Sequence, residues 1–336
     1  MDIGKVSRAK KLKNRKNQTH QKWLEARRES IGASEVAALL GLHKYQTPYQ
    51  LYDSKVGPVV EKKSDAITMG QLFEPHIYAI WQSKMRDTTE GEWSFFECPH
   101  VLQHHECKRL TTNLDGWGER VIKSDWQEPG ADREMSLRER YVVEIKHTGV
   151  YARGDWKQYK ETGNPTGIFL AYWLQVQTQL AVTGFSHGYL VVLIDKALEW
   201  IRIQADEQVH ETITTEVDAF WRLHIERSTP PDADGLDMAH IRAKHPTEEP
   251  GKTIERTDLK GMTEKHRYLR SERTKNEQVY IKPLTKEMQT IEAMIASEMG
   301  DAAILVVGDD VEPVRYETRT RKGFTVKETS KRVIKI

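Results

Sequence analysis

The sequence predicts an α/β (α+β) fold with a central mixed β-sheet flanked by helices, plus a helical C-terminal extension. Helical patterns come first along the chain and are followed by four strand patterns that enclose one further helix. This order is typical of a sheet covered by helices. Beyond about residue 261, apolar residues recur at spacings of three and four, which indicates an amphipathic helix outside the core.

Length and composition limit the class of protein. A chain of 336 residues can bury one sizeable core and a smaller appendage. Its two cysteines argue against a secreted disulfide scaffold, and no apolar signal region or membrane-spanning stretch is visible. We therefore expect a protein of the cytoplasm that does not enter a membrane. The basic run between Met1 and Lys22 predicts a disordered tail over about residues 1–20.

Helix signals dominate the first part of the chain. Ser34 is placed to cap a short helix that ends at Gly41, and Thr47-Pro48 begins another helix that ends at Gly57. A further helix is expected over 73–85, with Pro75 in its first turn and an apolar stripe of Phe73, Ile77, Ile80 and Trp81. A short helix over 23–28 precedes them all.

Strand patterns follow, at Arg109–Asp115, Tyr141–Thr148, Tyr189–Ile194 and Leu198–Ile203. A helix over 171–183, closed by Gly184, lies between the second and third strands. Residues 117–140 separate the first two strands, and the polar stretch from about Asp125 to Arg138 within them is interpreted as an exposed loop. The predicted domains are a core over 21–228, a linker over 229–261 and a helical and basic extension over 262–336, with a new helix starting at Pro283.

The most informative segment is Val143-Glu144-Ile145-Lys146. Side chains alternate along a strand, so Glu144 and Lys146 share one face while the two apolar residues face the other. Asp115 ends the preceding strand, and the carboxylates of Asp115 and Glu144 converge if the two strands are neighbours. Two carboxylates suit a hard divalent ion such as Mg²⁺ or Mn²⁺, which can polarise a phosphodiester. Taken alone, however, Glu144 and Lys146 are better explained as a surface ion pair on an edge strand.

Further pieces occur in a fixed order around this pair and cover about residues 23–203. They are Trp23 with Arg27, Ile31-Gly32-Ala33-Ser34-Glu35, Gly70-Gln71-Leu72-Phe73-Glu74-Pro75, Asn113-Leu114-Asp115-Gly116, Val143-Glu144-Ile145-Lys146, Trp156, Pro165 and Tyr172-Trp173-Leu174-Gln175-Val176-Gln177. This ordered set resembles the PD-(D/E)XK nucleases, in particular the YqaJ-like viral recombinases and the phage lambda-type exonucleases. The resemblance implies a restriction-endonuclease-like core.

The resemblance also implies roles for individual residues. Asp115, Glu144 and the backbone carbonyl of Ile145 would hold Mg²⁺ or Mn²⁺, with two ions in the site, and Lys146 would be the catalytic lysine. Glu74 would complete the acidic cluster through water, although a first-turn helix acid is an equal explanation for it. Arg27 and Ser34 match positions that grip a phosphate, and Gln175 matches a glutamine beside the active site and the DNA. Gln179, one helical turn on, is explained equally well by solvent exposure.

The function that follows from the resemblance is a metal-dependent exonuclease acting on ends of double-stranded DNA. The implied polarity is 5′ to 3′, with the product passed to a single-strand annealing protein during phage-type recombination in the host cytoplasm. A ring-like homo-oligomer is also implied. Two alternatives stay open, namely a related endonuclease and a non-catalytic DNA-binding protein with a relic site.

Other residues with ligand chemistry are given a lesser role. The group Cys98, His100, His104, His105 and Cys107 has zinc-ligand types, but it leads into the Asp115 strand, so a zinc site is disfavoured. Two cysteines are also too few for a four-cysteine iron–sulfur cluster. His147 lies on the strand face opposite Lys146, and we expect it to pack rather than to act in catalysis.

Overall fold

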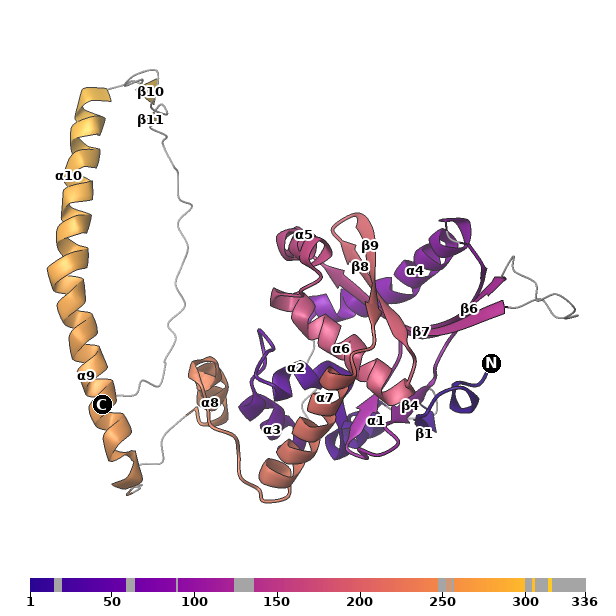
Figure 1. The fold of residues 1–336 in the computed structure, drawn as a ribbon. Coiled ribbons are helices and arrows are strands. Elements are labelled where there is room, and N and C mark those ends of the chain that lie inside the picture. Colours follow the sequence, from indigo (N-terminus) through magenta and orange to yellow (C-terminus); the bar gives the residue numbers. More distant parts are fainter. Residues whose placement is uncertain are drawn as a thin grey trace, which may run out of the picture. The chain divides into compact units, whose positions relative to one another are not determined.

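The computed structural model describes residues 1–14, 20–58, 64–88, 90–123, 136–246, 253, 255, 257–299, 304–305 and 314–315. The chain forms two compact units, Met1–Ile241 and Arg242–Ile336 (Figure 1). The first unit contains the five-stranded and the four-stranded sheet and the residues of the candidate site. No helix in the described ranges has both the length and the apolar character needed to cross a lipid bilayer.

A mixed five-stranded sheet forms the centre of the first unit. Its order is β3 (Glu92–Phe96), β6 (Gly116–Lys123), β7 (Ser136–Thr148), β8 (His187–Ile194) and β9 (Ala197–Gln204). β7 and β8 run parallel, and the other neighbours run antiparallel. The predicted fold class, a mixed sheet flanked by helices, is confirmed.

Alternation along β7 divides the core between the two faces of this sheet. Val143 and Ile145 pack in a cluster with Ile77 and Trp81 of α4 (Asp65–Thr88). Val142 packs in a second cluster with residues of α6 (Gly167–Thr183), among them Val176. α4 and α6 therefore cover opposite faces of the sheet (Figure 1). Glu144 and Lys146 belong to the face that α6 covers.

A smaller sheet has the order β1 (Lys10–Asn14), β4 (His100–Gln103), β5 (Leu110–Thr112) and β2 (Ile31–Gly32). It corrects the expectation of a disordered tail over residues 1–20, because β1 pairs with β4 and Ile3 is only 3% exposed. Lysines fit an edge strand such as β1, since their ammonium groups reach water from there. The part of the expected tail at residues 15–19 lies outside the described residues.

Two helices have the ends that the sequence predicts. α3 (Pro48–Val56) starts with the Thr47 hydroxyl accepting from the backbone N–H of Gln50 and stops at Gly57. α6 stops at Gly184, whose φ of +71° is the left-handed conformation that glycine favours. These ends were predictable because each depends on local backbone chemistry.

Other predictions about helices were wrong. α4 begins at Asp65, so Pro75 lies inside it and not in the first turn. The helix continues through Pro75 on an exposed side, where water can satisfy the carbonyl that proline leaves without a donor. Ile80, expected in the apolar stripe, is 54% exposed. Ser34 lies within a 3₁₀ turn (Ala33–Glu35) that Gly32 caps, before α2 (Val36–Leu39), and so is not an N-cap.

The predicted linker over 229–261 also needs correction. Its first part includes a 3₁₀ turn, Gly235–Asp237, and the start of α8 (Met238–Lys244). Asp237 is fully buried and accepts hydrogen bonds from the Thr47 hydroxyl and from the Gln50 amide at 3.0 Å. A segment rich in Asp and Pro therefore docks on α3 because one of its acids finds buried donors. The remaining helices of the unit are α1 (His20–Ala26), α5 (Arg153–Thr162) and α7 (Glu207–Phe220), which continues into a π turn, Trp221–Ile225.

The second unit is built on one long helical run. α9 (Lys260–Asn276) continues through a π turn (Glu277–Ile281) into α10 (Lys282–Met299). The prediction that Pro283 separates two helices was therefore wrong, and Pro283 lies in the first turn of α10, directly after the π turn. β10 (Ile304–Leu305) pairs with β11 (Val314–Arg315), and the rest of the basic C-terminal segment lies outside the described residues.

Candidate active site

Asp115 and the strand that carries Glu144 meet in the central sheet. Asp115 lies directly before β6. The prediction that Asp115 ends a strand was therefore wrong. Because Gly116 pairs with Val143 across β6 and β7, Asp115 reaches the next part of β7. Its Oδ2 accepts a hydrogen bond of 2.8 Å from the backbone N–H of Ile145. The structure thus brings Asp115 beside Glu144 and Lys146.

Three side chains hold the Glu144 carboxylate, which is only 1% exposed. Lys146 Nζ and Gln175 Nε2 donate to its Oε1, the latter at 2.6 Å. Gln179 Nε2 donates to its Oε2, and Gln179 is fully buried. Solvent exposure is therefore not the explanation for Gln179. Both glutamine amides reach Glu144 because residues four apart lie on one face of α6.

Electrostatics at the site reflect buried charges packed together. Burial raises the pKa of Asp115 well above its ordinary value, Glu144 and Glu74 raise it further, and Lys146 opposes them. Burial lowers the pKa of Lys146, but Glu144 and Asp115 outweigh burial and raise it overall. Lys146 also lies over the ring of Tyr172, with its Nζ 5.3 Å from the ring centre. Lys146 is thus held as an ammonium between carboxylates and an aromatic face.

Glu74 is near Asp115 and comes from the helix that covers the face of the sheet opposite to α6. It lies on α4, is half-buried, and its charge contributes to the raised pKa of Asp115. α4 packs closely on β6 here, because a Cβ atom added to Gly116 would lie 2.3 Å from the Tyr78 hydroxyl. Glu74 is therefore near Asp115, as the sequence led us to expect.

The donor set fits a hard divalent cation. Asp115 and Glu144 offer carboxylate oxygens from neighbouring strand positions, and such ions take oxygen ligands and keep several waters. Burial, and then the neighbouring carboxylate of Glu144, raise the pKa of Asp115, and a bound cation would favour its charged form. Within the described ranges, no cluster of three or more His, Cys, Asp or Glu side chains is arranged to hold a metal ion. The fit therefore depends on the two carboxylates of Asp115 and Glu144.

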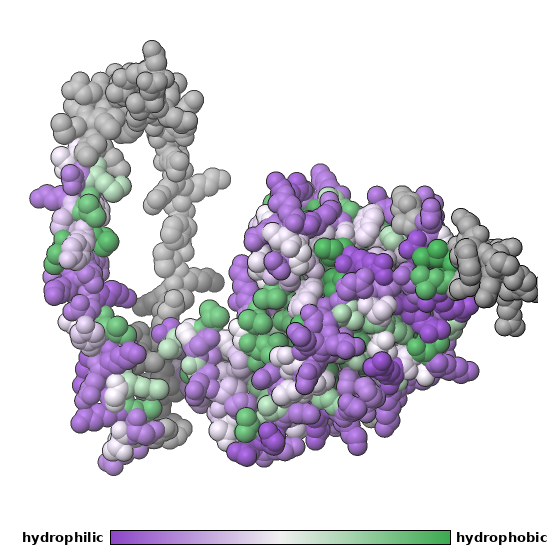
Figure 2. Space-filling model, viewed as in Figure 1, coloured by the Kyte–Doolittle hydropathy of each residue, from purple (hydrophilic) through white to green (hydrophobic). Residues whose placement is uncertain are grey.

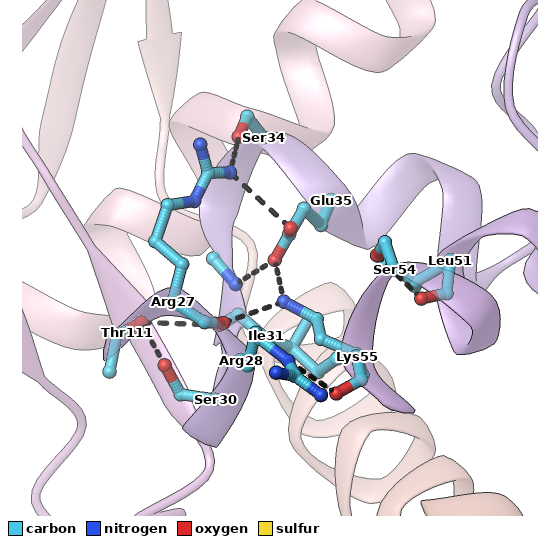
Figure 3. Close-up of polar contacts among 11 residues, drawn as sticks. Arg27, Arg28, Ser30, Ile31, Ser34, Glu35, Leu51, Ser54, Lys55 and Thr111 are labelled. Atoms are coloured by element: carbon cyan, nitrogen blue, oxygen red, sulfur yellow. Dashed lines mark hydrogen bonds and ion pairs between the residues drawn. The ribbon is translucent and has the colours of Figure 1, made fainter. Parts of the chain in front are cut away.

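A second polar group joins the 3₁₀ turn Arg27–Glu29 after α1, the turn Ala33–Glu35 and α3 (Figure 3). The Arg27 guanidinium reaches the Ser34 hydroxyl at 3.4 Å and Glu35 Oε1 at 3.3 Å. Glu35 Oε2 accepts from Lys55 Nζ at 2.7 Å and from the Gly32 N–H at 2.8 Å. Lys55 Nζ also donates to the Arg27 carbonyl at 2.8 Å. The structure thus brings the predicted residues Arg27 and Ser34 together and adds Glu35 and Lys55 to them.

Residues with lesser expected roles have partners of their own. Cys107 Sγ donates to Asp218 at 3.3 Å, and His104 Nδ1 accepts from the Cys107 N–H at 3.0 Å. His147 is exposed, with its ring centre 5.0 Å from that of Phe73. The contact with Phe73 agrees with the packing role expected for His147.

Residues 22–186 match the model of the YqaJ-like viral recombinase domain. This part of the chain is a YqaJ-like domain. The resemblance inferred from the ordered motifs is confirmed, and the domain includes Arg27, Ser34, Glu74, Asp115, Glu144, Lys146 and Gln175.

Individual proteins are also similar to this chain. The uncharacterized protein YqaJ of Bacillus subtilis (strain 168) is 25% identical over 309 residues, which is 90% of this chain and 85% of the relative. A solved alkaline exonuclease from Laribacter hongkongensis is 20% identical, covers 68% of this chain and all of its own (100%), and has a TM-score of 0.44. A phage-related exonuclease from Haemophilus somnus 129PT is 9% identical, covers 59% of this chain and 96% of its own, and has a TM-score of 0.34.

Lys55 is the residue of the YqaJ-like domain that sequence reasoning missed. Its side chain is 2% exposed although it is a lysine. A signal was present, because Lys55 follows the buried residues Leu51 and Tyr52 at spacings of four and three on α3. A lysine on the apolar face of a helix needs a buried acid as partner, and Glu35 lies in the quoted motif Ile31-Gly32-Ala33-Ser34-Glu35.

Proposed function

We propose that the protein is a metal-dependent deoxyribonuclease that hydrolyses phosphodiester bonds from the ends of linear duplex DNA, in the 5′ to 3′ direction. The observation that carries the proposal is the meeting of Asp115, directly before β6, with Glu144 and Lys146 of β7. A strand that presents a buried carboxylate and an ammonium together has no need of them for packing. The YqaJ-like domain supports the same chemistry.

The residues proposed to hold Mg²⁺ or Mn²⁺ are Asp115, Glu144 and the carbonyl of Ile145, with Glu74 acting through water, and we expect two ions. When bound, the cation supplies Lewis-acid polarisation of the phosphate. The chain itself contributes the rigid placement of Glu144, through the amides of Gln175 and Gln179. Lys146 places a positive charge where negative charge develops on the phosphate.

Arg27 and Ser34 are the residues we assign to a terminal phosphate of the DNA. A guanidinium beside a hydroxyl is a suitable anion site, and Arg27 is 36% exposed and thus accessible. Gln175, which we also expected at the DNA, holds Glu144 next to the scissile strand. A phosphate site separate from the hydrolytic site favours cleavage at an end over cleavage within a strand.

The proposed setting is phage-type homologous recombination in the host cytoplasm. The product, a single strand, would pass to a single-strand annealing protein, and the enzyme would act as a homo-oligomer around DNA. Support comes from the viral recombinase domain. Double-stranded DNA ends are thus the proposed substrate.

The experiment uses linear duplex DNA with a labelled end that carries either a phosphate or a hydroxyl. The full-length protein is incubated with it in Mg²⁺, in Mn²⁺ or in chelator, and closed circular duplex is the parallel substrate. We expect digestion of linear DNA with metal only. Cutting of closed circles would indicate an endonuclease. Absence of any digestion would refute the proposal that the protein is a nuclease.

Site variants test the assignment of residues separately. Asp115→Ala and Lys146→Ala should each digest DNA at least about a hundredfold more slowly, since each removes charge from the reacting centre. His147→Ala is the matched control on the same strand, and it should keep the wild-type rate. Digestion at the wild-type rate by Asp115→Ala or Lys146→Ala would refute the assigned site even if the activity stands.

A further inference from the structure

The buried ion pair of Glu35 and Lys55 lies next to the residues assigned to the terminal phosphate (Figure 3). Lys55 comes from the last turn of α3, and Glu35 comes from the 3₁₀ turn that follows β2. Glu35 contacts Arg27 as well, so a single carboxylate lies between two cations. The role inferred below for this arrangement rests on the proposed function, in which Arg27 binds a phosphate.

The two oxygens of Glu35 are not used equally. Oε2 makes the close contacts, with Lys55 Nζ at 2.7 Å and with the Gly32 N–H at 2.8 Å. Oε1 meets Arg27 Nη2 at 3.3 Å, beyond the usual length of a charge-assisted hydrogen bond. Glu35 is thus paired chiefly with Lys55, whereas its contact with Arg27 is the weaker one.

Charge and burial explain why it matters that Glu35 pairs chiefly with Lys55 and only weakly with Arg27. Arg27, Lys55 and Glu35 together carry two positive charges and one negative charge. The Lys55 side chain is 2% exposed and the Arg27 side chain 36%, so the charge that faces solvent is that of Arg27. Arginine forms two parallel hydrogen bonds with a carboxylate when nothing competes, and such a pair would turn the guanidinium away from an incoming anion.

We propose that Lys55 is a positioning residue that neutralises Glu35, so that Arg27 stays oriented for the terminal phosphate. Lys55 also donates to the Arg27 carbonyl at 2.8 Å, while Arg28 Nε donates to the Lys55 carbonyl at 2.9 Å. These two bonds fix the backbone of Arg27 against α3. Removal of Lys55 would leave Glu35 with one cation, Arg27, and the phosphate would have to compete with a carboxylate for it.

The test measures binding of the full-length protein to two fluorescent duplexes that differ only in a 5′-phosphate or 5′-hydroxyl end, in chelator so that no cleavage occurs. The quantity compared is the ratio of the two Kd values. Wild type should prefer the phosphate by roughly tenfold, as a charge-assisted contact allows. Arg27→Gln should bring the ratio close to one.

The decisive comparison is between a single and a double variant. Lys55→Met should lower the ratio toward that of Arg27→Gln, because Glu35 then captures Arg27. Lys55→Met with Glu35→Gln should restore the ratio toward wild type, because the competing charge is gone. A role confined to holding the fold predicts no such restoration. Lys157→Met with Glu161→Gln is the matched control, since it removes an exposed pair of the same residue types, 3.8 Å apart, on α5.

Melting temperatures establish whether each variant folds. If Lys55→Met alone does not fold, the single variant Glu35→Gln provides the test. Its ratio of Kd values should equal or exceed that of wild type. A fall to the Arg27→Gln value overturns the proposal. A folded Lys55→Met protein with the wild-type ratio overturns it as well, as does a wild type that digests DNA with no phosphate preference. A wild type that neither binds nor digests DNA is a different outcome, since there the proposed function itself fails.

Discussion

At the scale of single residues, the candidate site depends on how α6 holds Glu144. A carboxylate that is 1% exposed needs donors for its oxygens, and Gln175, Gln179 and Lys146 supply them. Gln179 is the most informative of these residues, because it is fully buried and also donates to the Asn113 carbonyl at 3.4 Å. It links the segment before Asp115 to Glu144.

Gln179→Met should reduce kcat about tenfold and leave KM nearly unchanged. Methionine keeps the volume but removes the donor, so Glu144 loses one hydrogen bond to a charged group, which is worth about 1.5–3 kcal/mol. Steady-state digestion of linear duplex measures the effect. Gln208→Met, on the exposed face of α7, is the control, and an unchanged kcat in Gln179→Met would contradict the role.

His187 leads to a prediction about stability and pH. It is fully buried, its Nδ1 lies 3.1 Å from the Ser186 hydroxyl, and burial, aided by Arg202, lowers its pKa from 6.5 to about 4. Between these values the unfolded chain binds a proton that the folded chain does not. Stability should therefore fall as pH drops from 6.5 to about 4, by up to ~3 kcal/mol from this residue.

Urea unfolding of wild type and of His187→Gln over that range checks this prediction. The free energy of unfolding of the variant should depend less steeply on pH, because its side chain does not titrate. Burial also lowers the pKa values of His104 and His210, but these residues are the same in both proteins. Parallel pH profiles for the two proteins would show that His187 is not the group responsible.

At the scale of elements, β6 and the first part of β7 include residues that the sequence pattern had placed between two strands. Glu119 is 5% exposed and pairs with Arg138 at 2.9 Å and Arg140 at 3.1 Å. Glu139 pairs with Arg202 of β9 at 3.2 Å. In sequence these residues give a polar stretch, whereas in the sheet their charges pair across strands. Residues 125–135 of the predicted loop lie outside the described residues.

Features that depend on local signals could be predicted from the sequence, whereas features that depend on contacts between distant segments could not. α3, α6, β8 and β9 were predictable because caps and apolar runs are local signals. The shared face of Glu144 and Lys146 follows from strand alternation alone, and Asp115 came within one residue of its true place before β6. The docking of Asp237 on Thr47 and the pairing of Lys55 with Glu35 depend on contacts between distant segments, which local patterns do not contain.

Gly116→Ala should destabilise the protein by about 1–3 kcal/mol, as overpacking of a tight contact does. The added Cβ would lie 2.3 Å from the Tyr78 hydroxyl and 2.4 Å from its ring, so α4 and β6 must separate. Thermal unfolding measures the loss. Gly154→Ala is the control on α5, where no described atom lies within 4 Å of the added Cβ and helix propensity favours alanine. Equal melting temperatures for the two variants would contradict the close approach.

At the scale of the whole molecule, the two units differ in how they bury apolar residues. Both hydrophobic clusters formed by the described residues lie within residues 3–225 of the first unit. Apolar side chains of α9, of the π turn after it and of α10 are exposed instead (Figure 2). They include Met262, Tyr268, Leu269, Val279, Tyr280, Ile281, Leu284 and Met288.

A chain ending at residue 246 should therefore fold cooperatively, with a melting temperature within about 5 °C of the full-length value. The truncation removes α9 and α10 and leaves both clusters intact. Circular dichroism during heating provides the measurement. Loss of a cooperative transition would show that the first unit needs the second in order to fold.

The buried group around Glu144 is proposed to be a hydrolytic centre. Glu144→Gln tests it most directly, because the variant keeps the shape and removes one negative charge. The measurement is the rate of nucleotide release from a labelled linear duplex in Mg²⁺. We predict digestion by wild type and a loss of at least about a thousandfold in Glu144→Gln. Equal rates for the two proteins would contradict the claim.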